Sequence, residues 1–268
     1  IVATGAKENC LAFPGSTLPG VMGAGAAQTM INVNRVLPGQ RILMLGSGNV
    51  GLIVSYQLMQ AGADVVALVD AAPNIGGYGV HAGKIRRAGV PFYISHTIKR
   101  VTGRDQVEQV EIVQVDGKFQ PIPGTEQIFD CDTLLLSVGL LPENELTRAL
   151  GAEMDPRTNG AVVYENMETS IPGVFACGNV LQVHDLVDFV SAESGRAGAA
   201  AADYVLRGGA VPQRVIPVEN GSAVTYTVPQ RIRAEAAGAG VQIFFRVNRV
   251  FGKSVVTVKR GETQIARF

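Results

Sequence analysis

Apolar residues in the first part of the chain fall into short continuous runs separated by segments with helical spacing. Residues 41–46 and 64–70 are apolar runs bounded by polar residues, as expected for strands buried on both faces of a sheet. Between them, residues 51–61 carry apolar side chains at helical spacing, and Gly62 stands where a C-cap glycine belongs. This alternation predicts an α/β fold with a parallel sheet.

Further elements follow from the same patterns. We predict strands over residues 1–5, 91–95, 131–138 and 174–177, and helices over residues 24–36, 79–88 and 187–206. Residues 106–129 alternate in short stretches around Asp116-Gly117, which predicts a hairpin. After about residue 211 the pattern is β-like, with strands expected over residues 224–228, 241–247, 254–258 and 263–268. We therefore expect a small all-β C-terminal appendage over residues 210–268.

Composition excludes several classes of function. The 23 Lys and Arg balance the 23 Asp and Glu, and no basic run is present, so nucleic acid is not an expected partner. No apolar run of about 18 residues could span a bilayer, and no secretory signal is found. We expect a cytoplasmic protein with reduced thiols at Cys10, Cys131 and Cys177. The first residues resemble the middle of a buried strand, which predicts an upstream segment. No cluster has metal-ligand spacing.

The strongest motif is Gly46-Ser-Gly48-Asn-Val-Gly51, because it follows a predicted strand and opens a predicted helix. Gly46 permits the tight turn, Gly48 lets a pyrophosphate approach the backbone, and Gly51 lets the helix pack on the strand. Free N–H groups at the helix start then face the anion. We expect the whole loop to contact a dinucleotide, that is Gly46, Ser47, Gly48, Asn49, Val50 and Gly51. A purely structural glycine turn is the alternative.

An acid about 20 residues after the loop sets the expected cofactor. Asp70 ends the second strand and would accept hydrogen bonds from a ribose hydroxyl pair. A 2′-phosphate would meet like charge there, and no Arg directly follows Asp70 to neutralise it. The sequence therefore favours NAD over NADP. Gly139 ends a parallel strand at the edge where ligands bind such sheets, so we expect it near the nicotinamide.

Two flanking motifs carry a family resemblance: Ala3-Thr4-Gly5 upstream, and Thr169-Ser-Ile-Pro-Gly-Val-Phe-Ala-Cys-Gly-Asn179 downstream. With the glycine loop between them, residues 1–208 resemble the pyridine nucleotide:flavin oxidoreductases. Within that family, Gly23-Ala-Gly-Ala-Ala-Gln28 is similar to segments of opine and sarcosine oxidase flavoprotein subunits. The run from Leu43 to Asp188 looks like the flavoproteins that accompany anaerobic glycerol-3-phosphate dehydrogenases.

The resemblance implies a Rossmann-type NAD domain over residues 34–144, inserted in a partial FAD domain over residues 1–33 and 145–209. It implies FAD and NAD as cofactors, with hydride passing from NADH C4 to flavin N5 and electrons then leaving to a second acceptor. An electron-carrying partner protein is the expected outlet, because no C-x-x-C motif is present. A homodimer is a further candidate assembly. The residues expected to face FAD are Thr4, Gly5, Gly178, Asn179 and Val187.

Two features depart from the family. Asn179 stands where the family usually has Asp, and the family's own N-terminal FAD loop is absent from the sequence. A non-catalytic NAD-binding or subunit-docking module that has lost FAD binding is therefore the alternative function. An NAD-dependent alcohol dehydrogenase is disfavoured, because no His–Asp or Tyr–Lys catalytic arrangement is apparent.

No single side chain is assigned a catalytic role. His184 and Asp185 invite acid–base chemistry, but capping or packing at the start of a helix is the favoured interpretation. Glu193 is expected to be a satisfied or solvated carboxylate. The resemblance implies that backbone N–H groups of residues 186–188 face the charge that develops on a reduced flavin, with helix packing as the alternative. Tyr78 either packs over the adenine ring of the dinucleotide or is an aromatic residue of a loop without a binding role. Lys84, Arg86 and Arg87 are expected to form a solvent-exposed face of a helix.

Overall fold

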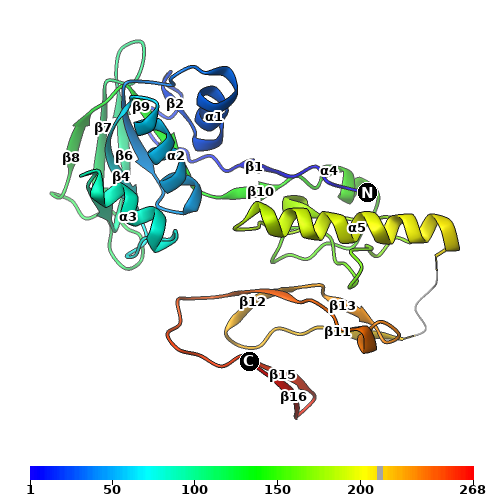
Figure 1. Cartoon of the computed structure of the whole chain (residues 1–268). Coiled ribbons are helices and arrows are strands. Elements are labelled where there is room, and N and C mark those ends of the chain that lie inside the picture. Colours follow the sequence, from blue (N-terminus) through cyan, green and yellow to red (C-terminus); the bar gives the residue numbers. More distant parts are fainter. Residues whose placement is uncertain (210–213) are drawn as a thin grey trace. The chain divides into compact units, whose positions relative to one another are not determined.

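The chain forms two compact units. The computed structural model describes residues 1–209 and 214–268, and contacts divide them into a unit of residues 7–141 and a unit of residues 1–6 with 142–268. We call these the sheet unit and the split unit. The chain passes from one to the other along β1 (Ala6–Glu8) and β10 (Leu140–Pro142) (Figure 1). Residues 210–213, the start of the expected appendage, lie outside the described residues.

A five-stranded parallel sheet forms the centre of the sheet unit, with strand order β2-β9-β3-β4-β5. Its strands are β2 (Val21–Gly23), β3 (Arg41–Leu45), β4 (Asp64–Asp70), β5 (Phe92–Ile94) and β9 (Thr133–Leu136). The segments that connect them contain α1 (Ala24–Thr29), a π-helical turn (Met30–Asn34), α2 (Asn49–Gln60) and α3 (Gly79–Arg87). The predicted α/β fold with a parallel sheet is confirmed.

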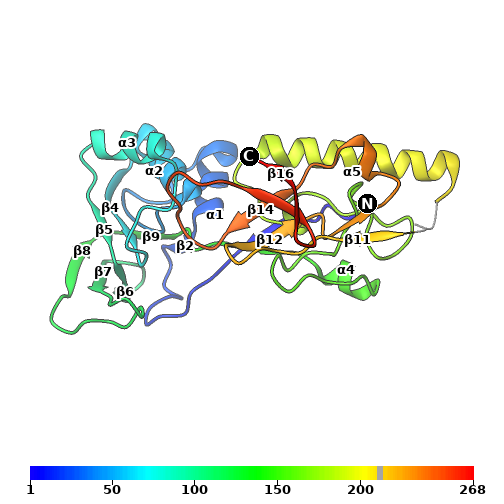
Figure 2. The same ribbon diagram turned by 90° about the horizontal axis from the view of Figure 1, so that it is seen from below.

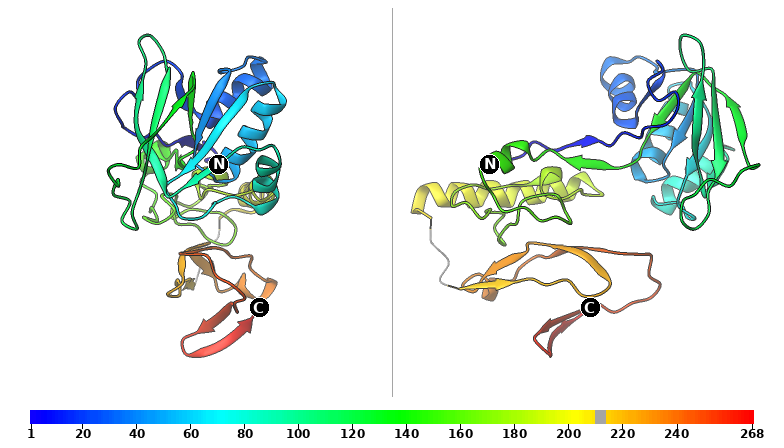
Figure 3. Two further views of the ribbon diagram at one scale, coloured as in Figure 1. Left: turned by 90° about the vertical axis from the view of Figure 1, so that its left-hand side faces the viewer. Right: turned by 180° about the vertical axis from the view of Figure 1, so that it is seen from behind.

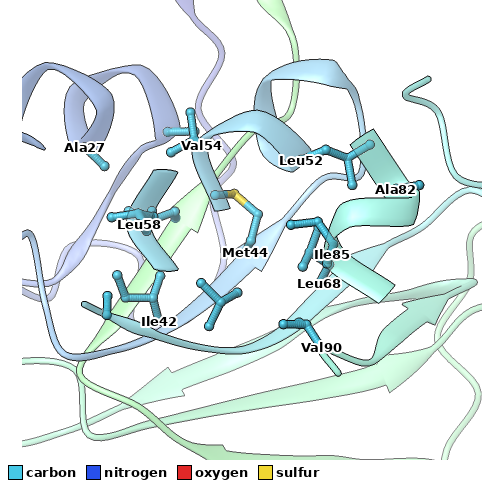
Figure 4. Packing of buried hydrophobic residues seen from close by; sticks show 14 residues of the cluster. Ala27, Ile42, Met44, Leu52, Val54, Leu58, Leu68, Ala82, Ile85 and Val90 are labelled. Atoms are coloured by element: carbon cyan, nitrogen blue, oxygen red, sulfur yellow. The ribbon is translucent and has the colours of Figure 1, made fainter. Parts of the chain in front are cut away.

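Both faces of this sheet are buried, which explains its continuous apolar runs. Along β3, Ile42 and Met44 face the helices and pack with Leu52 of α2 and Ile85 of α3 (Figure 4). The alternate residues of β3 join a second cluster on the other face. Helices therefore cover one face and a second sheet covers the other (Figure 3, left).

The second sheet is antiparallel, with order β6-β7-β8. Its strands are β6 (His96–Thr102), β7 (Gln109–Gln114) and β8 (Gln127–Asp130). The predicted hairpin corresponds to β7 and β8, whereas β6 was not expected. A register shift between Ile98 and Arg100 breaks the alternation of β6, so only Ile98 and Val101 of this strand are buried. That irregular pattern hides the strand in the sequence.

In the split unit, two of the predicted strands are wrong as extended elements. Residues 1–5 and 174–177 form only isolated bridges, Val2 with Ala176 and Phe175 with Glu168. Gly5 and Gly178 have φ of 75° and 78°, which ends the extended backbone on each side. Between residues 143 and 209 the helical elements are α4 (Glu145–Ala149), a 3₁₀ turn (Gly178–Val180) and the unbroken helix α5 (Val187–Arg207) (Figure 3, right). A second 3₁₀ turn (Ala237–Ala239) lies among the C-terminal strands.

The C-terminal residues form three antiparallel pairs (Figure 2). They are β11 (Val215–Pro217) with β13 (Arg231–Arg233), β12 (Val224–Val228) with β14 (Phe244–Val247), and β15 (Thr257–Arg260) with β16 (Thr263–Arg267). Tyr226 and Val228 share a hydrophobic core with Ala161 and Ala176. Arg233 forms ion pairs with Glu165, at 3.0 Å, and with Glu168.

The contact units therefore divide the chain differently from the boundaries expected at residues 33/34 and 209/210. Residues 7–33 group with the sheet unit, because β2 pairs with β9 and α1 packs on α2. The C-terminal strands group with residues 142–209, because they share the core and ion pairs described above.

Candidate dinucleotide-binding site

The glycine loop lies between β3 and α2, and its three glycines are required for different reasons. Gly46 has φ of 106°, and a Cβ there would lie 2.1 Å from the carbonyl oxygen of Ser137. A Cβ on Gly51 would lie 2.1 Å from the carbonyl oxygen of Gly46. A Cβ on Gly48 would meet nothing within 4 Å. Packing therefore demands Gly46 and Gly51, whereas Gly48 leaves open space in front of the loop.

The N-terminus of α2 fits an anion. Gly48 is the N-cap, no side chain caps the helix, and the first turn contains no acidic residue. The first N–H groups of a helix have no partner within the helix, and they carry the positive end of its dipole. Val50 in this turn is 43% exposed, so the helix start is accessible. A phosphate placed there would satisfy these donors.

Asp70 connects the end of β4 to the glycine loop. Its Oδ2 accepts hydrogen bonds from the Ser47 hydroxyl and, at 2.7 Å, from the Ser47 backbone N–H. Its Oδ1 accepts from the backbone N–H of Ala72 at 2.9 Å. A carboxylate has about four acceptor positions, so three donors leave capacity for one more hydrogen bond. The residue expected to hold a ribose therefore also fixes the loop, a second role that its position in the sequence does not indicate.

The segment after β4 is fastened to the same loop. Gly77 N–H donates to the Ser47 carbonyl at 2.8 Å, and Tyr78 N–H donates to Asn49 Oδ1 at 2.8 Å. A Cβ on Gly77 would lie 3.0 Å from the backbone nitrogen of Asn49 and 2.5 Å from Leu52 Cδ1, so a larger residue there would require the Leu52 side chain to shift. The Tyr78 side chain remains 46% exposed. Ser47 and Asn49 thus act as cross-links within the described structure, and nothing in their sequence spacing indicates that role.

A pocket of about 230 Å³ opens beside these residues. It lies at the carboxyl ends of β3, β4 and β9, where open α/β sheets bind ligands. Its volume is below the roughly 300–1,000 Å³ of pockets for drug-sized ligands, so it suits one portion of a dinucleotide. It is lined by Leu11, Leu45, Gly46, Gly48, Asp70, Ala71, Thr97, Ser137 and Val138. Gly139 is not among the lining residues, although Val138 beside it is.

The residues expected to face FAD lie in the split unit. Thr4 Oγ1 donates to the Glu143 carbonyl at 2.6 Å, and the Gly5 carbonyl accepts from Glu143 N–H at 3.0 Å. Cys177 N–H donates to the Val2 carbonyl at 3.2 Å, which places residues 2–5 beside the strand-like segment that leads into Gly178 and Asn179. The structure therefore brings the two family motifs together. Val187 opens α5 and is 73% exposed.

Glu193 organises the loop that follows the second motif. This fully buried carboxylate accepts from Gly178 N–H at 2.7 Å and from Gln182 Nε2 at 3.0 Å, and His184 Nε2 lies 3.2 Å from it. Asn179 Oδ1 accepts from His184 N–H at 3.1 Å. The structure thus gives His184 a packing role and makes Glu193 a satisfied carboxylate. No pattern in the sequence indicates that His184 and Glu193 are in contact.

No disulfide links the three cysteines of the chain, all of which lie in its described part. All are free, with Cys10 exposed and the other two buried. Burial, reinforced by the charge of Asp132, raises the pKa of Cys131 to about 12. Within residues 1–209 and 214–268, no group of three or more His, Cys, Asp and Glu could hold a metal ion. No helix in those ranges combines the length and hydrophobicity that a bilayer span requires.

Fold and site together are those of an α/β protein with a glycine loop before an uncapped helix, an arrangement that fits a dinucleotide. The model of the pyridine nucleotide-disulphide oxidoreductase family matches residues 1–202, and the chain belongs to that family. Proteins of this family use FAD and NAD(P) as cofactors. The family resemblance of the sequence motifs is therefore confirmed.

Curated relatives extend this result. The chain is 25% identical over 203 residues to an NADH oxidase of Methanocaldococcus jannaschii, covering 72% of this chain and 41% of the relative. It is 27% identical over 216 residues to an opine oxidase subunit of Rhizobium meliloti, covering 76% and 39%. Over 128 residues it is 35% identical to the alpha chain of a sarcosine oxidase of Rhizobium meliloti, covering 46% and 13%. The similarity to opine and sarcosine oxidase subunits is confirmed.

Among solved structures, the thioredoxin reductase of T. acidophilum has the same fold. Its TM-score is 0.61 at 18% identity, covering 76% of this chain and 64% of that protein. The chain spans about two fifths of the length of the NADH oxidase and of the opine oxidase protein.

Proposed function

We propose that this chain is the NAD(H)-binding part of an FAD-dependent oxidoreductase that passes electrons between NAD(H) and a second acceptor. The observation that carries the proposal is the arrangement of Gly48, the uncapped start of α2 and Asp70 around one pocket. An anion site and a ribose acceptor then lie at the carboxyl edge of one parallel sheet. Dinucleotides bind at that edge in such folds.

NAD is the dinucleotide that these residues fit. The backbone N–H groups at the start of α2 would bind the pyrophosphate, and Gly48 leaves room for it. The remaining acceptor capacity of Asp70 would serve the adenosine ribose. A 2′-phosphate on that ribose would face the Asp70 carboxylate, which disfavours NADP. Gly139 follows the lining residue Val138, which supports its proposed place near the nicotinamide.

The split unit supports a flavin half-site. Bound FAD would supply hydride and single-electron chemistry. The first turn of α5 presents N–H groups without a side-chain cap next to the exposed side chain of Val187. An apolar ring system with polar edges suits such a surface. Thr4, Gly5, Gly178 and Asn179 would complete this half-site, with the amide nitrogen of Asn179 facing the ligand because its oxygen serves His184.

The domain organisation is part of the proposal. Residues 34–144 would be an NAD domain inserted in an FAD domain, of which residues 1–33 and 145–209 are the part present, and residues 210–268 would be an all-β addition. Residues 7–33 would then belong to the FAD part by sequence order while packing on the NAD domain. A partner protein would receive the electrons, since two relatives are subunits by name and the described thiols offer no disulfide pair. A homodimer is the other proposed assembly.

One observation favours the non-catalytic alternative, an NAD-binding or subunit-docking module. The N–H of Gly178 is engaged by Glu193, and the oxygen of Asn179 is engaged by His184, so two groups expected to face FAD are used within the loop. That alternative predicts NADH binding without flavin.

A visible absorption spectrum of the purified chain, repeated after anaerobic addition of NADH, tests the proposal. A flavin band that bleaches with NADH supports the oxidoreductase. Colourless protein that still binds NADH supports the non-catalytic module. NADH binding is measured by the increase in NADH fluorescence. A chain that does not bind NADH would overturn both the oxidoreductase and the non-catalytic module.

A further inference from the structure

The loop before α5 and the first turn of α5 are in contact with a strand from the C-terminal part of the chain. Residues 183–189 connect the Asn179 loop to the first turn of α5, which the proposed function places against the flavin. Strand β14 contacts this segment through two side chains, Phe244 and Arg246. Because β14 lies beyond residue 202, it falls outside the part of the chain that the family model matches.

The ring of Phe244 contacts residues near both ends of this segment, His184 and Phe189. Its centroid lies 5.8 Å from the His184 ring and 5.9 Å from the Phe189 ring, both in edge-to-face geometry. The Arg196 guanidinium lies 5.7 Å from the same centroid. Edge-to-face pairs at this distance attract each other. The ring therefore links the loop before α5 with the first turn of α5 and with its third turn.

Arg246 adds hydrogen bonds on the neighbouring stretch. Its Nη2 donates to Asp185 Oδ2 at 3.0 Å and to the Val183 carbonyl at 3.3 Å. Its Nε donates at 3.1 Å to the hydroxyl of Tyr226, whose side chain belongs to the core of the split unit. The loop is thereby tied to that core through one guanidinium group.

Glu193 also holds this loop, because its carboxylate lies within hydrogen-bond distance of the His184 ring and of Gly178 N–H. Residues 183–189 therefore have two supports. One is the buried carboxylate of Glu193, which lies in the part of the chain that the family model matches, and the other is β14, which lies outside that part. Helix dipoles act on a ligand only within about one turn, so the position of this first turn determines what it can stabilise.

We propose that Phe244 and Arg246 are positioning residues that hold residues 183–189 in the conformation that presents the first turn of α5 to the flavin. The flavin part of this inference rests on the proposed function. Phe244 contributes most of the stabilisation of residues 183–189, which we call the hold. The Arg246–Asp185 pair contributes less, because it is about half exposed and exposed ion pairs contribute little.

Hydrogen–deuterium exchange followed by mass spectrometry tests the hold itself on the whole chain without added cofactor. In Phe244→Ala, peptides covering residues 183–190 should exchange about tenfold faster, because two ring contacts are lost. Phe245→Ala is the matched control: this neighbour in β14 is 45% exposed and faces away from Phe244 along the strand. Peptides covering β3 should not change in either variant.

Two conservative variants keep the test decisive. Phe244→Tyr retains the ring and should restore slow exchange, and Phe244→Leu covers the case in which the alanine variant does not fold. Unchanged exchange in residues 183–190 for both Phe244→Ala and Phe244→Leu would overturn the hold. Equal acceleration in Phe245→Ala would also overturn it, since the effect would then not come from the ring.

Flavin titration tests the link to the site. If the parent chain quenches FAD fluorescence, Phe244→Ala should weaken FAD binding several-fold and shift the flavin absorption band, while Phe245→Ala leaves both unchanged. Unaltered FAD binding and spectrum in Phe244→Ala would refute the positioning role. A parent chain without FAD binding would instead defeat the flavin part of the proposed function, and the exchange experiment would still decide the hold.

Discussion

Two glycines of the loop, Gly48 and Gly51, lie three residues apart and should respond in opposite ways to the same added methyl group. In Gly51→Ala, the new Cβ would lie 2.1 Å from the carbonyl oxygen of Gly46, more than 1 Å inside ordinary contact, so α2 must move away from β3. Overpacking of a buried contact typically costs about 1–3 kcal/mol. We expect Gly51→Ala to lose free energy of unfolding in that range.

Gly48→Ala should leave the fold nearly unchanged. Gly48 has φ of −68° and ψ of 175°, which any L-residue adopts, and its Cβ would contact nothing within 4 Å. Alanine is a poorer N-cap than glycine by about half a kcal/mol. That loss is offset by a gain of about 0.4–1 kcal/mol from reduced freedom of the unfolded chain. The net change should be within about 0.5 kcal/mol.

The affinity for NADH should respond in the opposite way from the stability, and it should fall more in Gly48→Ala than in Gly51→Ala. The methyl group would occupy the open space in front of α2 and keep the pyrophosphate from the N–H groups. A hydrogen bond to a charged group contributes about 1.5–3 kcal/mol, so losing one should weaken binding about ten- to hundredfold.

Urea unfolding followed by circular dichroism gives the stability of each variant, and titration with NADH, followed by NADH fluorescence, gives the affinity. Parent-like NADH affinity in Gly48→Ala would refute the loop as the phosphate site. Parent-like stability in Gly51→Ala would refute the packing explanation for that glycine.

Three further predictions concern single residues. Asp70→Asn should raise the ratio of NADPH to NADH affinity about tenfold, because a like charge facing a 2′-phosphate is removed; an unchanged ratio in parallel titrations would separate Asp70 from cofactor choice. Glu193→Ala should lower the free energy of unfolding by about 3 kcal/mol, because three buried donors lose their acceptor, and Glu193→Gln should lose less; equal losses in urea unfolding would contradict this. Cys131, with its pKa raised from 9.0 to about 12, should stabilise the fold below pH 9 and lose that contribution as pH rises toward 12, because the unfolded thiol ionises first. Free energies of unfolding compared across this pH window should fall less in Cys131→Ala than in the parent chain.

Much of the sheet unit could be predicted because its pattern is local. Strands buried on both faces produce continuous apolar runs, and β3, β4 and β9 were located from those runs alone. The helix α2 was placed by its spacing and by the glycine that follows it. The strands β2, β6 and β10 were not predicted: β2 and β10 are short and flanked by irregular segments, and β6 has an interrupted alternation.

Contacts between distant residues could not be predicted in the same way. Glu193 supports Gly178 across 15 residues, and Arg233 pairs with Glu165 across 68 residues, without any pattern that connects them. The C-terminal strands were expected to form an appendage, because the residue pattern after about residue 211 is β-like and differs from the α/β pattern of the rest of the chain. Their integration depends on contacts such as those of Arg233 with Glu165 and Glu168, which lie 68 and 65 residues away.

The glycine loop shows where the limit lies. By itself the sequence determined that a strand, a G-x-G-x-x-G turn, a helix and a later acid follow one another, because spacing and local conformational freedom decide that order. Only the tertiary structure decided which glycines serve packing and which leaves space for a ligand. That distinction depends on Ser137, which the parallel pairing of β3 with β9 brings against Gly46 from 91 residues away.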